Sequence, residues 1–236
     1  MPATTEVKVS QWGRYLAPLR IFILKMKKIW ILGGGRFGRL ALKHTARHLP
    51  RAEITVIDKS EKLEKFPGVE AVRGDGVSWL VQHLSRDSDV DLIIPAIPVH
   101  VVAGWLKLVA GRQYKVSSAT VPESYVAELP NVMTGGDSTV YVSHADFLCP
   151  DNCGEPEKFC TVTGKPRSED MFRLLERAGA LVIRSHQLYP GVGGIYPKDL
   201  WALYDRIAGL PAEPILVATA CRCHGVVDGL LFIPRI

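Results

Sequence analysis

The sequence predicts an α/β protein with a doubly wound parallel sheet, followed by a second α/β half that carries a cluster of cysteines. Apolar, strand-like segments alternate with amphipathic helical segments along most of the 236 residues. This alternation is typical of parallel sheets whose strands are joined by helices. A glycine-rich turn also follows the first strand directly and opens the first helix, which favours the same class of fold.

The elements of the first half follow from periodicity and from the positions of glycine and proline. We expect strands at 28–32, 53–57, 69–72, 91–95 and 114–119, and helices at 36–48, 76–84 and 99–110. Pro50 stops the first helix and Gly111 caps the third. The strand at 91–95 is almost wholly apolar, as a parallel strand buried on both faces should be. These elements predict a nucleotide-binding domain over 26–120.

The second half, 121–236, also alternates and forms the cysteine-rich α/β region. Here we expect strands at 139–143, 180–185, 214–219 and 229–233, and helices at 168–178 and 198–208. The pattern leaves open whether these strands extend the first sheet or form a second one.

The glycine turn has the spacing of a dinucleotide-binding fingerprint, with Gly33, Gly35 and Gly38 in the order G-x-G-x-x-G. The first glycine allows the tight turn, the second lets backbone N–H groups approach a pyrophosphate, and the third lets the helix pack closely on the strand. Asp58 ends the second strand twenty positions after Gly38, where a ribose ligand is expected. The alternative is a glycine-rich turn of an α/β protein that has lost its ligand.

The segment from Gly33 to Asp58, followed by VEAVRGDG over 69–76, resembles the Rossmann-type nucleotide-binding domain of potassium-transport regulators (TrkA-N, also called RCK N-terminal). The resemblance covers about 27–110. It implies NAD as the bound dinucleotide, with an aspartate after the third strand near the adenosine. The residues implied in cofactor binding are Gly33, Gly35, Arg36, Phe37, Gly38, Asp58, Lys59 and Asp75.

Asp58 favours NAD over NADP, because a carboxylate accepts from both ribose hydroxyls best when no phosphate occupies the 2′ position. Lys59 follows directly and could tolerate such a phosphate, or it is a solvated loop lysine. Arg36, inside the turn, could shield the pyrophosphate.

All five cysteines fall in two short windows, Cys149, Cys153 and Cys160 in the first and Cys221 and Cys223 in the second. Such clustering in a cytosolic chain favours metal or redox chemistry over structural disulfides. Thiolates suit an iron–sulfur cluster or zinc, although the spacing matches neither the usual zinc pairs nor the ferredoxin run. Disulfide or thiol chemistry without a metal stays open. With His224 the donors exceed four tetrahedral positions, so at least one is spare.

If the later strands run parallel to one another, both cysteine windows and the Gly191–Gly194 loop follow strand carboxyl ends, the edge where open α/β sheets bind ligands. A thiolate centre beside a nicotinamide would be a redox arrangement, and a structural clip that ties down long loops is the alternative. His100 would be a proton donor near the nicotinamide or a helix-start histidine with a backbone bond. His186 and Tyr189 would line a substrate pocket or simply pack at a strand end.

Composition limits the function classes. With 47% apolar and 22% charged residues the chain is globular, and no apolar run approaches the roughly 20 residues of a membrane span. Of the net charge of +5, residues 1–25 hold +3, so the rest has no clear electrostatic footprint for nucleic acid. Because the first strand follows Met26 almost at once, we expect 1–25 to be a dispensable leader. Without a secretory signal, the sequence predicts a cytoplasmic protein.

Three functions follow as expectations. The first is a redox-linked protein, such as an NAD-dependent oxidoreductase, that binds NAD(H) and holds a cysteine-ligated metal centre. The second is a non-catalytic, NAD-responsive regulator of the TrkA-N type, and the third is a structural or assembly protein with a zinc clip. The sequence leaves a small-molecule substrate and a homo-oligomeric state open.

Overall fold

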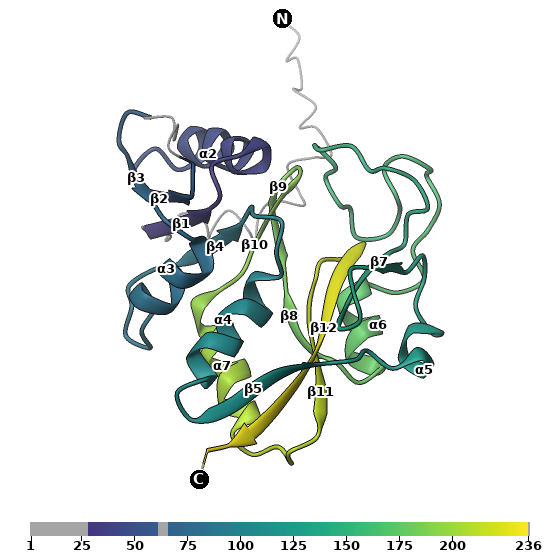
Figure 1. The fold of residues 1–236 in the computed structure, drawn as a ribbon. Helices are drawn as coiled ribbons and strands as arrows, with labels where there is room; N and C mark the ends of the chain where they lie inside the picture. The colour runs from purple at the N-terminus through teal and green to yellow at the C-terminus, as the bar shows by residue number, and fades with distance from the viewer. Residues whose placement is uncertain (1–27, 61–65, 236) are drawn as a thin grey trace, which may run out of the picture.

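The computed structural model describes residues 28–60 and 66–235 and shows a mixed α/β molecule with two main sheets (Figure 1). The first sheet has four parallel strands in the order β3-β2-β1-β4. Their bounds are β1 Lys28–Leu32, β2 Glu53–Asp58, β3 Val69–Arg73 and β4 Leu92–Pro95. The predicted α/β class and its parallel sheet are therefore confirmed.

Helices cover both faces of this sheet. On one face, Ile29 and Ile31 of β1 pack with Ala41 and Leu42 of helix α2 (Arg36–His48). On the other face, Leu32 packs in a cluster that includes helices α3 (Gly76–His83) and α4 (Val101–Ala110). Successive residues of a strand point to opposite faces, so burial on both sides requires the uninterrupted apolar sequence of β1 and β4.

The second sheet has six strands, in the order β6-β7-β12-β11-β8 with β5 also paired to β12. Strand β12 runs antiparallel to β5, β7 and β11, whereas β8 runs parallel to β11. Strands β7, β8 and β11 therefore point the same way. Their bounds are β5 Tyr114–Ala119, β6 Met133–Thr134, β7 Thr139–Ser143, β8 Leu181–Arg184, β11 Pro214–Ala220 and β12 His224–Pro234.

Helices also cover both faces of the second sheet. Helix α7 (Pro197–Ile207) packs beside α4 in the cluster shared with the first sheet. The short helix α5 (Glu123–Val126) and helix α6 (Met171–Arg177) pack in a separate cluster with β7, β11 and β12. The layer of α3, α4 and α7 is thus common to both halves of the molecule.

One strand lies in a different sheet from the one predicted. The segment 114–119 was expected to complete the first sheet, but β5 pairs along its whole length with β12. The free edge of β4 is taken instead by Ile195, which exchanges two backbone hydrogen bonds with Ile93 at 3.0 and 2.8 Å. Pairing between segments that lie over one hundred residues apart leaves no local signal in the sequence.

A hairpin links the two sheets. Strand β8 continues through Ser185 into β9 (His186–Tyr189), which turns at Gly191 and returns as β10 (Val192–Gly194) to the Ile195 bridge on β4. Gly191 has a φ of +73°, a conformation that glycine adopts without steric cost. The later strands therefore form a second sheet, joined to the first through this hairpin.

Two further expectations concern the N-terminal segment and the absence of membrane-spanning helices. The predicted leader, 1–25, lies outside the described residues. Among the helices of the described residues, none combines the length and the apolar character that a membrane crossing requires.

Candidate functional site

The glycines of the turn between β1 and α2 differ in their surroundings. Two of them are in close contact with the protein backbone, and the third faces open space. Gly33 has a φ of +111°, and a Cβ there would lie 2.5 Å from the carbonyl oxygen of Ala96. A Cβ on Gly38 would overlap the carbonyl oxygen of Gly33. A Cβ on Gly35 would meet no atom of the described residues within 4 Å. The packing of the protein itself thus accounts for Gly33 and Gly38 but not for Gly35.

Helix α2 begins at this turn without a side-chain cap. Gly35 is the N-cap residue, and the first turn holds no acidic side chain. Beside the turn, the Asp58 carboxylate accepts hydrogen bonds from the N–H groups of Gly34 at 2.5 Å and Ser60 at 2.7 Å. The first turn of a helix offers N–H donors and the positive end of its dipole, so the turn is chemically suited to an anion.

The other predicted cofactor residues already have partners within the protein. Arg36 forms an ion pair with Asp151 and lies over the ring of Phe37, which is 48% exposed. Lys59 pairs with Asp75 at 2.8 Å. Asp75 also caps α3 by accepting from the N–H of Ser78 at 2.8 Å.

These bonds have an electrostatic consequence for Asp75. The hydrogen bond from Lys59, followed by those from Ser78, lowers the pKa of the Asp75 carboxyl to about 2. In the structure Asp75 therefore caps helix α3. Lys59 forms an ion pair with Asp75, whereas the sequence suggested a solvated lysine or one that tolerates a 2′-phosphate.

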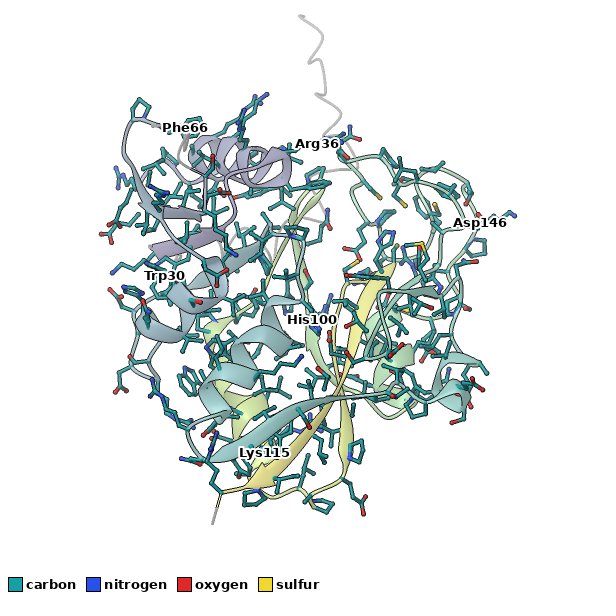
Figure 2. All side chains as sticks on the ribbon, viewed as in Figure 1. Trp30, Arg36, Phe66, His100, Lys115 and Asp146 are labelled. Atoms are coloured by element: carbon teal, nitrogen blue, oxygen red, sulfur yellow. The ribbon has the colours of Figure 1, made fainter. Side chains whose placement is uncertain are left out.

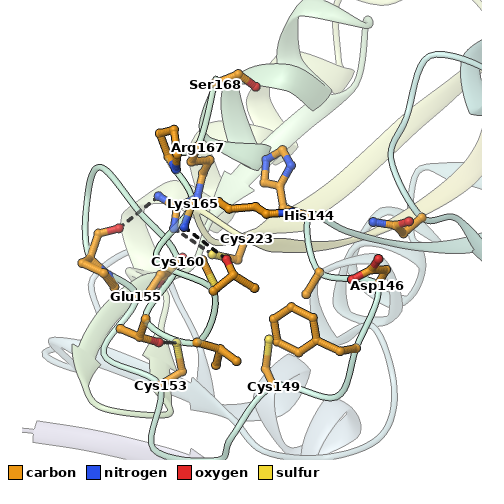
Figure 3. Close-up of a pocket in the computed structure, with 18 residues that line it drawn as sticks. His144, Asp146, Cys149, Cys153, Glu155, Cys160, Lys165, Arg167, Ser168 and Cys223 are labelled. Atoms are coloured by element: carbon orange, nitrogen blue, oxygen red, sulfur yellow. Dashed lines mark hydrogen bonds between the residues drawn. The ribbon is translucent and has the colours of Figure 1, made fainter.

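A second site is a pocket of about 290 Å³ into which four of the five cysteines point (Figure 3). Cys149, Cys153 and Cys160 come from the long loop after β7, and Cys223 comes from the turn between β11 and β12. Charged and polar neighbours also line it, among them His144, Glu155, Lys165 and Arg167.

The thiols of the first window differ in environment. Burial, together with the neighbouring thiols Cys153 and Cys160, raises the pKa of Cys149. Hydrogen bonds from the backbone and the hydroxyl of Thr163 lower the pKa of Cys160. The Sγ atom of Cys153 lies 3.3 Å from the hydroxyl of Thr161. The loop thus holds thiols of unequal acidity around one space.

Cys221 is set apart from the other four. It does not line the pocket, and burial followed by the Glu155 carboxylate raises its pKa well above the ordinary value. Glu155 is 8% exposed and accepts from the backbone N–H of Arg222. The ring of His224 lies between Cys149 and Cys221. Its Nε2 atom is 3.5 Å from Cys149 Sγ, and its Nδ1 atom is 3.8 Å from Cys221 Sγ.

The described side chains around the pocket do not form a metal site as they stand. Within 28–60 and 66–235, no three His, Cys, Asp or Glu side chains lie close enough to hold one metal ion together. All five cysteines are free thiols. The sequence prediction of a single five-cysteine site therefore corresponds to four thiols around one pocket, and metal binding stays a prediction.

The sequence singled out cysteines but not the groups that surround them. Arg167, whose side chain is 5% exposed, donates to the Sγ atom of Cys223 at 2.9 Å. Glu155 and His144 were likewise missed. In the sequence, Glu155 and Arg167 are marked only by their place near the first cysteine window. Because charged residues are normally solvent-exposed, this place did not indicate that they line a pocket.

The three residues proposed as weaker site candidates are engaged in packing. His100 is buried where the two halves meet (Figure 2), and its ring bonds the Asp228 carboxylate at 2.6 Å and the Thr219 hydroxyl at 2.8 Å. It therefore makes side-chain contacts in place of the expected backbone bond. His186 packs on Tyr196, and burial lowers its pKa to about 4. Tyr189 stacks on His44 and His48 of α2.

The glycine turn and the cysteine loop meet at the same edge of the molecule. Besides the Arg36–Asp151 ion pair, the carbonyl oxygen of Cys153 accepts from the N–H of Gly191 and from the Gln187 side chain, both at 2.9 Å. Both cysteine windows follow the carboxyl ends of strands that point the same way, β7 and β11, although the condition set for this, that the later strands run parallel to one another, fails for β12. The β9–β10 hairpin contacts the cysteine loop at the same edge, through Gln187 and Gly191.

Comparison with known proteins places the second half of the chain. The model of the family described as "AF_1314_C: Uncharacterized protein, C-terminal domain" matches residues 99–233, more than half of the chain. The chain belongs to this family. The AF_1314_C match begins just before α4, contains β5 together with the rest of the second sheet, and includes both cysteine windows.

A full-length relative extends the similarity over more of the chain. An "Uncharacterized protein" of Archaeoglobus fulgidus is 28% identical over 218 residues, which cover 85% of this chain and 97% of the relative. The similarity thus reaches beyond the AF_1314_C region into residues that precede it.

Proposed function

We propose that this protein binds NAD(H) at the glycine turn and holds a cysteine-ligated metal centre in the neighbouring pocket, as a redox-linked protein. The observation that carries the nucleotide part is the place of Gly35, which is the N-cap residue of α2 at the turn beside the Asp58 carboxylate. A Cβ built there would meet no described atom within 4 Å; other glycines, such as Gly209, share this open space but not this position. Close approach of a pyrophosphate requires a glycine at this place in the fold.

The surrounding fold supports the same reading. The strand order β3-β2-β1-β4 matches the first four strands of the 3-2-1-4-5-6 order of Rossmann-like folds, in which the pyrophosphate binds at the turn after the first strand. Asp58 ends β2 with its carboxylate at the turn. In this account Asp58 accepts from the ribose hydroxyls, and the N–H groups at the start of α2 donate to the phosphates.

The donor set of the pocket supports a thiolate centre. Thiolates that bind one zinc ion at about 2.3 Å lie roughly 4 Å from one another, and among the described residues no three metal-binding side chains are gathered closely enough to hold one ion. In a four-iron cluster each thiolate binds a different iron atom, so the ligands stand further apart. We therefore favour such a cluster over zinc, with Cys149, Cys153, Cys160 and Cys223 as its ligands.

Both sites would hold redox groups. A bound cluster would supply one-electron steps, and NAD(H) would exchange hydride with a substrate. The chain itself orients the nucleotide through Asp58 and the glycine turn. The loop that carries the first cysteine window is held against this turn by Arg36 and by the β9–β10 hairpin.

A second candidate is a non-catalytic, NAD-responsive regulator. The Arg36–Asp151 ion pair favours it, because phosphates that attract Arg36 would compete with Asp151 and so act on the cysteine loop without any reaction. The nucleotide site is common to both functions, and only the metal centre distinguishes them.

The metal centre is tested on the full chain purified without oxygen. Visible absorption from thiolate-bound iron, with iron and sulfide by elemental analysis, is the result expected for the redox-linked protein. A colourless protein with one zinc per chain would support the structural clip instead, and a metal-free protein that binds NADH would support the regulator.

The nucleotide preference is tested by calorimetry with NAD(H) and NADP(H). Asp58→Ala is expected to reduce the preference for NAD, because it removes the carboxylate that a 2′-phosphate would oppose. Asp87→Ala, an exposed position in another loop, is the matched control. An unchanged preference in Asp58→Ala would show that Asp58 does not bind the ribose.

A further inference from the structure

Arg167 is a buried cation that lies between the two cysteine windows. It follows a short hairpin in which Phe159 bridges to Pro166 and the N–H of Arg167 donates to the carbonyl of Lys158 at 2.9 Å. Cys160 lies within this hairpin. The side chain of Arg167 is 5% exposed and lines the thiol pocket (Figure 3).

The guanidinium of Arg167 contacts both cysteine-bearing segments at once. Its Nη1 atom donates to the carbonyl oxygens of Pro156 and Glu157, each at 3.0 Å, within the first loop. Its Nη2 atom donates to Cys223 Sγ at 2.9 Å, in the second. The Asp170 carboxylate lies 3.6 Å from Nη1. One planar group therefore joins segments that are more than fifty residues apart.

The chemistry of the side chain explains why an arginine stands here. A buried cation is costly unless its donors are paired, and the planar fork of a guanidinium can serve several acceptors in fixed directions. A lysine ammonium is a single point of charge on a flexible stem. It could reach the carbonyl oxygens or the thiol, but it would not hold both in one geometry.

We propose that Arg167 is the positioning residue that assembles the thiol pocket, because it fixes Cys223 opposite the cysteines of the first window. The inference deepens the proposed function and rests on it only for the metal. The positioning itself belongs to the metal-free chain, in which the contacts described above are made.

The test is a cross-linking experiment on the full, metal-free chain. A short bifunctional thiol reagent (dibromobimane) is applied, and bridged peptides are quantified by mass spectrometry. Arg167→Gln and Arg167→Lys are each expected to lower the yield of bridges between Cys223 and the first window at least threefold. Bridges within the first window serve as the internal reference and should change little. Arg173→Gln, an exposed position on the following helix, should behave like the wild type.

The ratio of bridges between windows to bridges within the first window decides the matter. An unchanged ratio in Arg167→Gln, with an unchanged melting temperature, would overturn the proposal. Should the Gln variant not fold, the Lys variant decides, since it keeps the charge and the length of the side chain. A wild-type ratio in that variant would equally overturn the proposal.

The metal content of the same proteins, measured after anaerobic loading with iron and sulfide, distinguishes failure of the proposed metal centre from failure of the proposed role of Arg167. Loss of bridging in a chain whose wild type takes up no metal would reject the metal centre and keep the role of Arg167. Full metal uptake with unchanged bridging in both variants would keep the centre and reject that role.

Discussion

Residues of the same type serve different purposes at this edge of the molecule. Gly33 and Gly38 are required by contacts within the protein, whereas Gly35 faces open space. Four cysteines point into one pocket, whereas Cys221 turns toward Glu155. Spacing in the sequence singled out the three glycines and the five cysteines. It could not tell which member of each set plays which part, because this depends on the neighbours that each residue has in the fold.

Asp151 is expected to weaken nucleotide binding in the wild type. It pairs with Arg36 and places a negative charge beside the glycine turn. Because the Arg36 side chain is largely exposed, such a pair contributes about 0.2–1 kcal/mol. Asp151→Asn should therefore bind NADH roughly two- to fivefold more tightly by calorimetry at low salt. The difference should shrink at high salt, and unchanged or weaker binding at low salt would contradict the prediction.

Cys221 is expected to be dispensable for metal content. Cys221→Ser should keep the iron and sulfide of the wild type, whereas Cys153→Ser, Cys160→Ser and Cys223→Ser should each lose most of it, because these three positions line the pocket and Cys221 does not. Elemental analysis of the four proteins measures this. Equal losses in Cys221→Ser and Cys223→Ser would show that the second window binds as a unit.

Among the elements, local signals predicted most of the bounds. Helix α2 and strands β5 and β7 have the predicted bounds, and most other elements differ by a few residues. The last strand was expected at 229–233 but extends over 224–234. Gly225 and Gly229 read as breaks in the sequence, yet the strand is held by partners on both sides, β7 and β11. The β9–β10 hairpin was expected as a loop for the same reason.

Helix α3 offers a pH-dependent test at this scale. Asp75 caps it, and replacement of a capping aspartate by alanine costs about 1 kcal/mol. Since the folded pKa of Asp75 is about 2, below the unfolded value of about 3.9, its contribution is fully present above roughly pH 5. The contribution is lost as the pH falls from about 4 toward 2.

Urea unfolding of the metal-free chain at several pH values measures this effect. Asp75→Ala should be less stable than the wild type at pH 7, and the difference should decrease as the pH is lowered toward 3. Asp87→Ala should match the wild type throughout. A difference that grows on acidification would contradict the assigned cap and ion pair.

The contact between α4 and the second sheet depends on His100. Its ring bonds Asp228, which also accepts from the Thr139 hydroxyl at 2.8 Å, and all three groups are at least partly buried. His100→Ala would leave the Asp228 carboxylate without this donor, so we expect a loss of about 2–3 kcal/mol in the free energy of unfolding. Chemical denaturation measures it, and Lys43→Ala on the exposed side of α2 is the control. A loss below about 0.5 kcal/mol, the usual range at surface positions, would contradict the role.

At the scale of the whole molecule, strand direction brings the candidate sites together. Strands β1, β7 and β11 each end at the edge where the glycine turn and the cysteine loop meet (Figure 1). The sequence led us to expect a shared edge only if the strands of both halves formed one continuous sheet, whereas the structure has two. It did not predict the hairpin that joins the sheets or the ion pair that joins the sites, because both depend on contacts between distant segments.

The most direct test of the central claim is a calorimetric titration of NADH into the full chain. Wild type and Gly209→Val, whose glycine also has nothing within 4 Å of a Cβ, are expected to bind one NADH per chain with the same affinity. Gly35→Val should not bind, because a β-branched side chain would occupy the path of the pyrophosphate. Equal binding by wild type and Gly35→Val, or no binding by the wild type, would contradict the account.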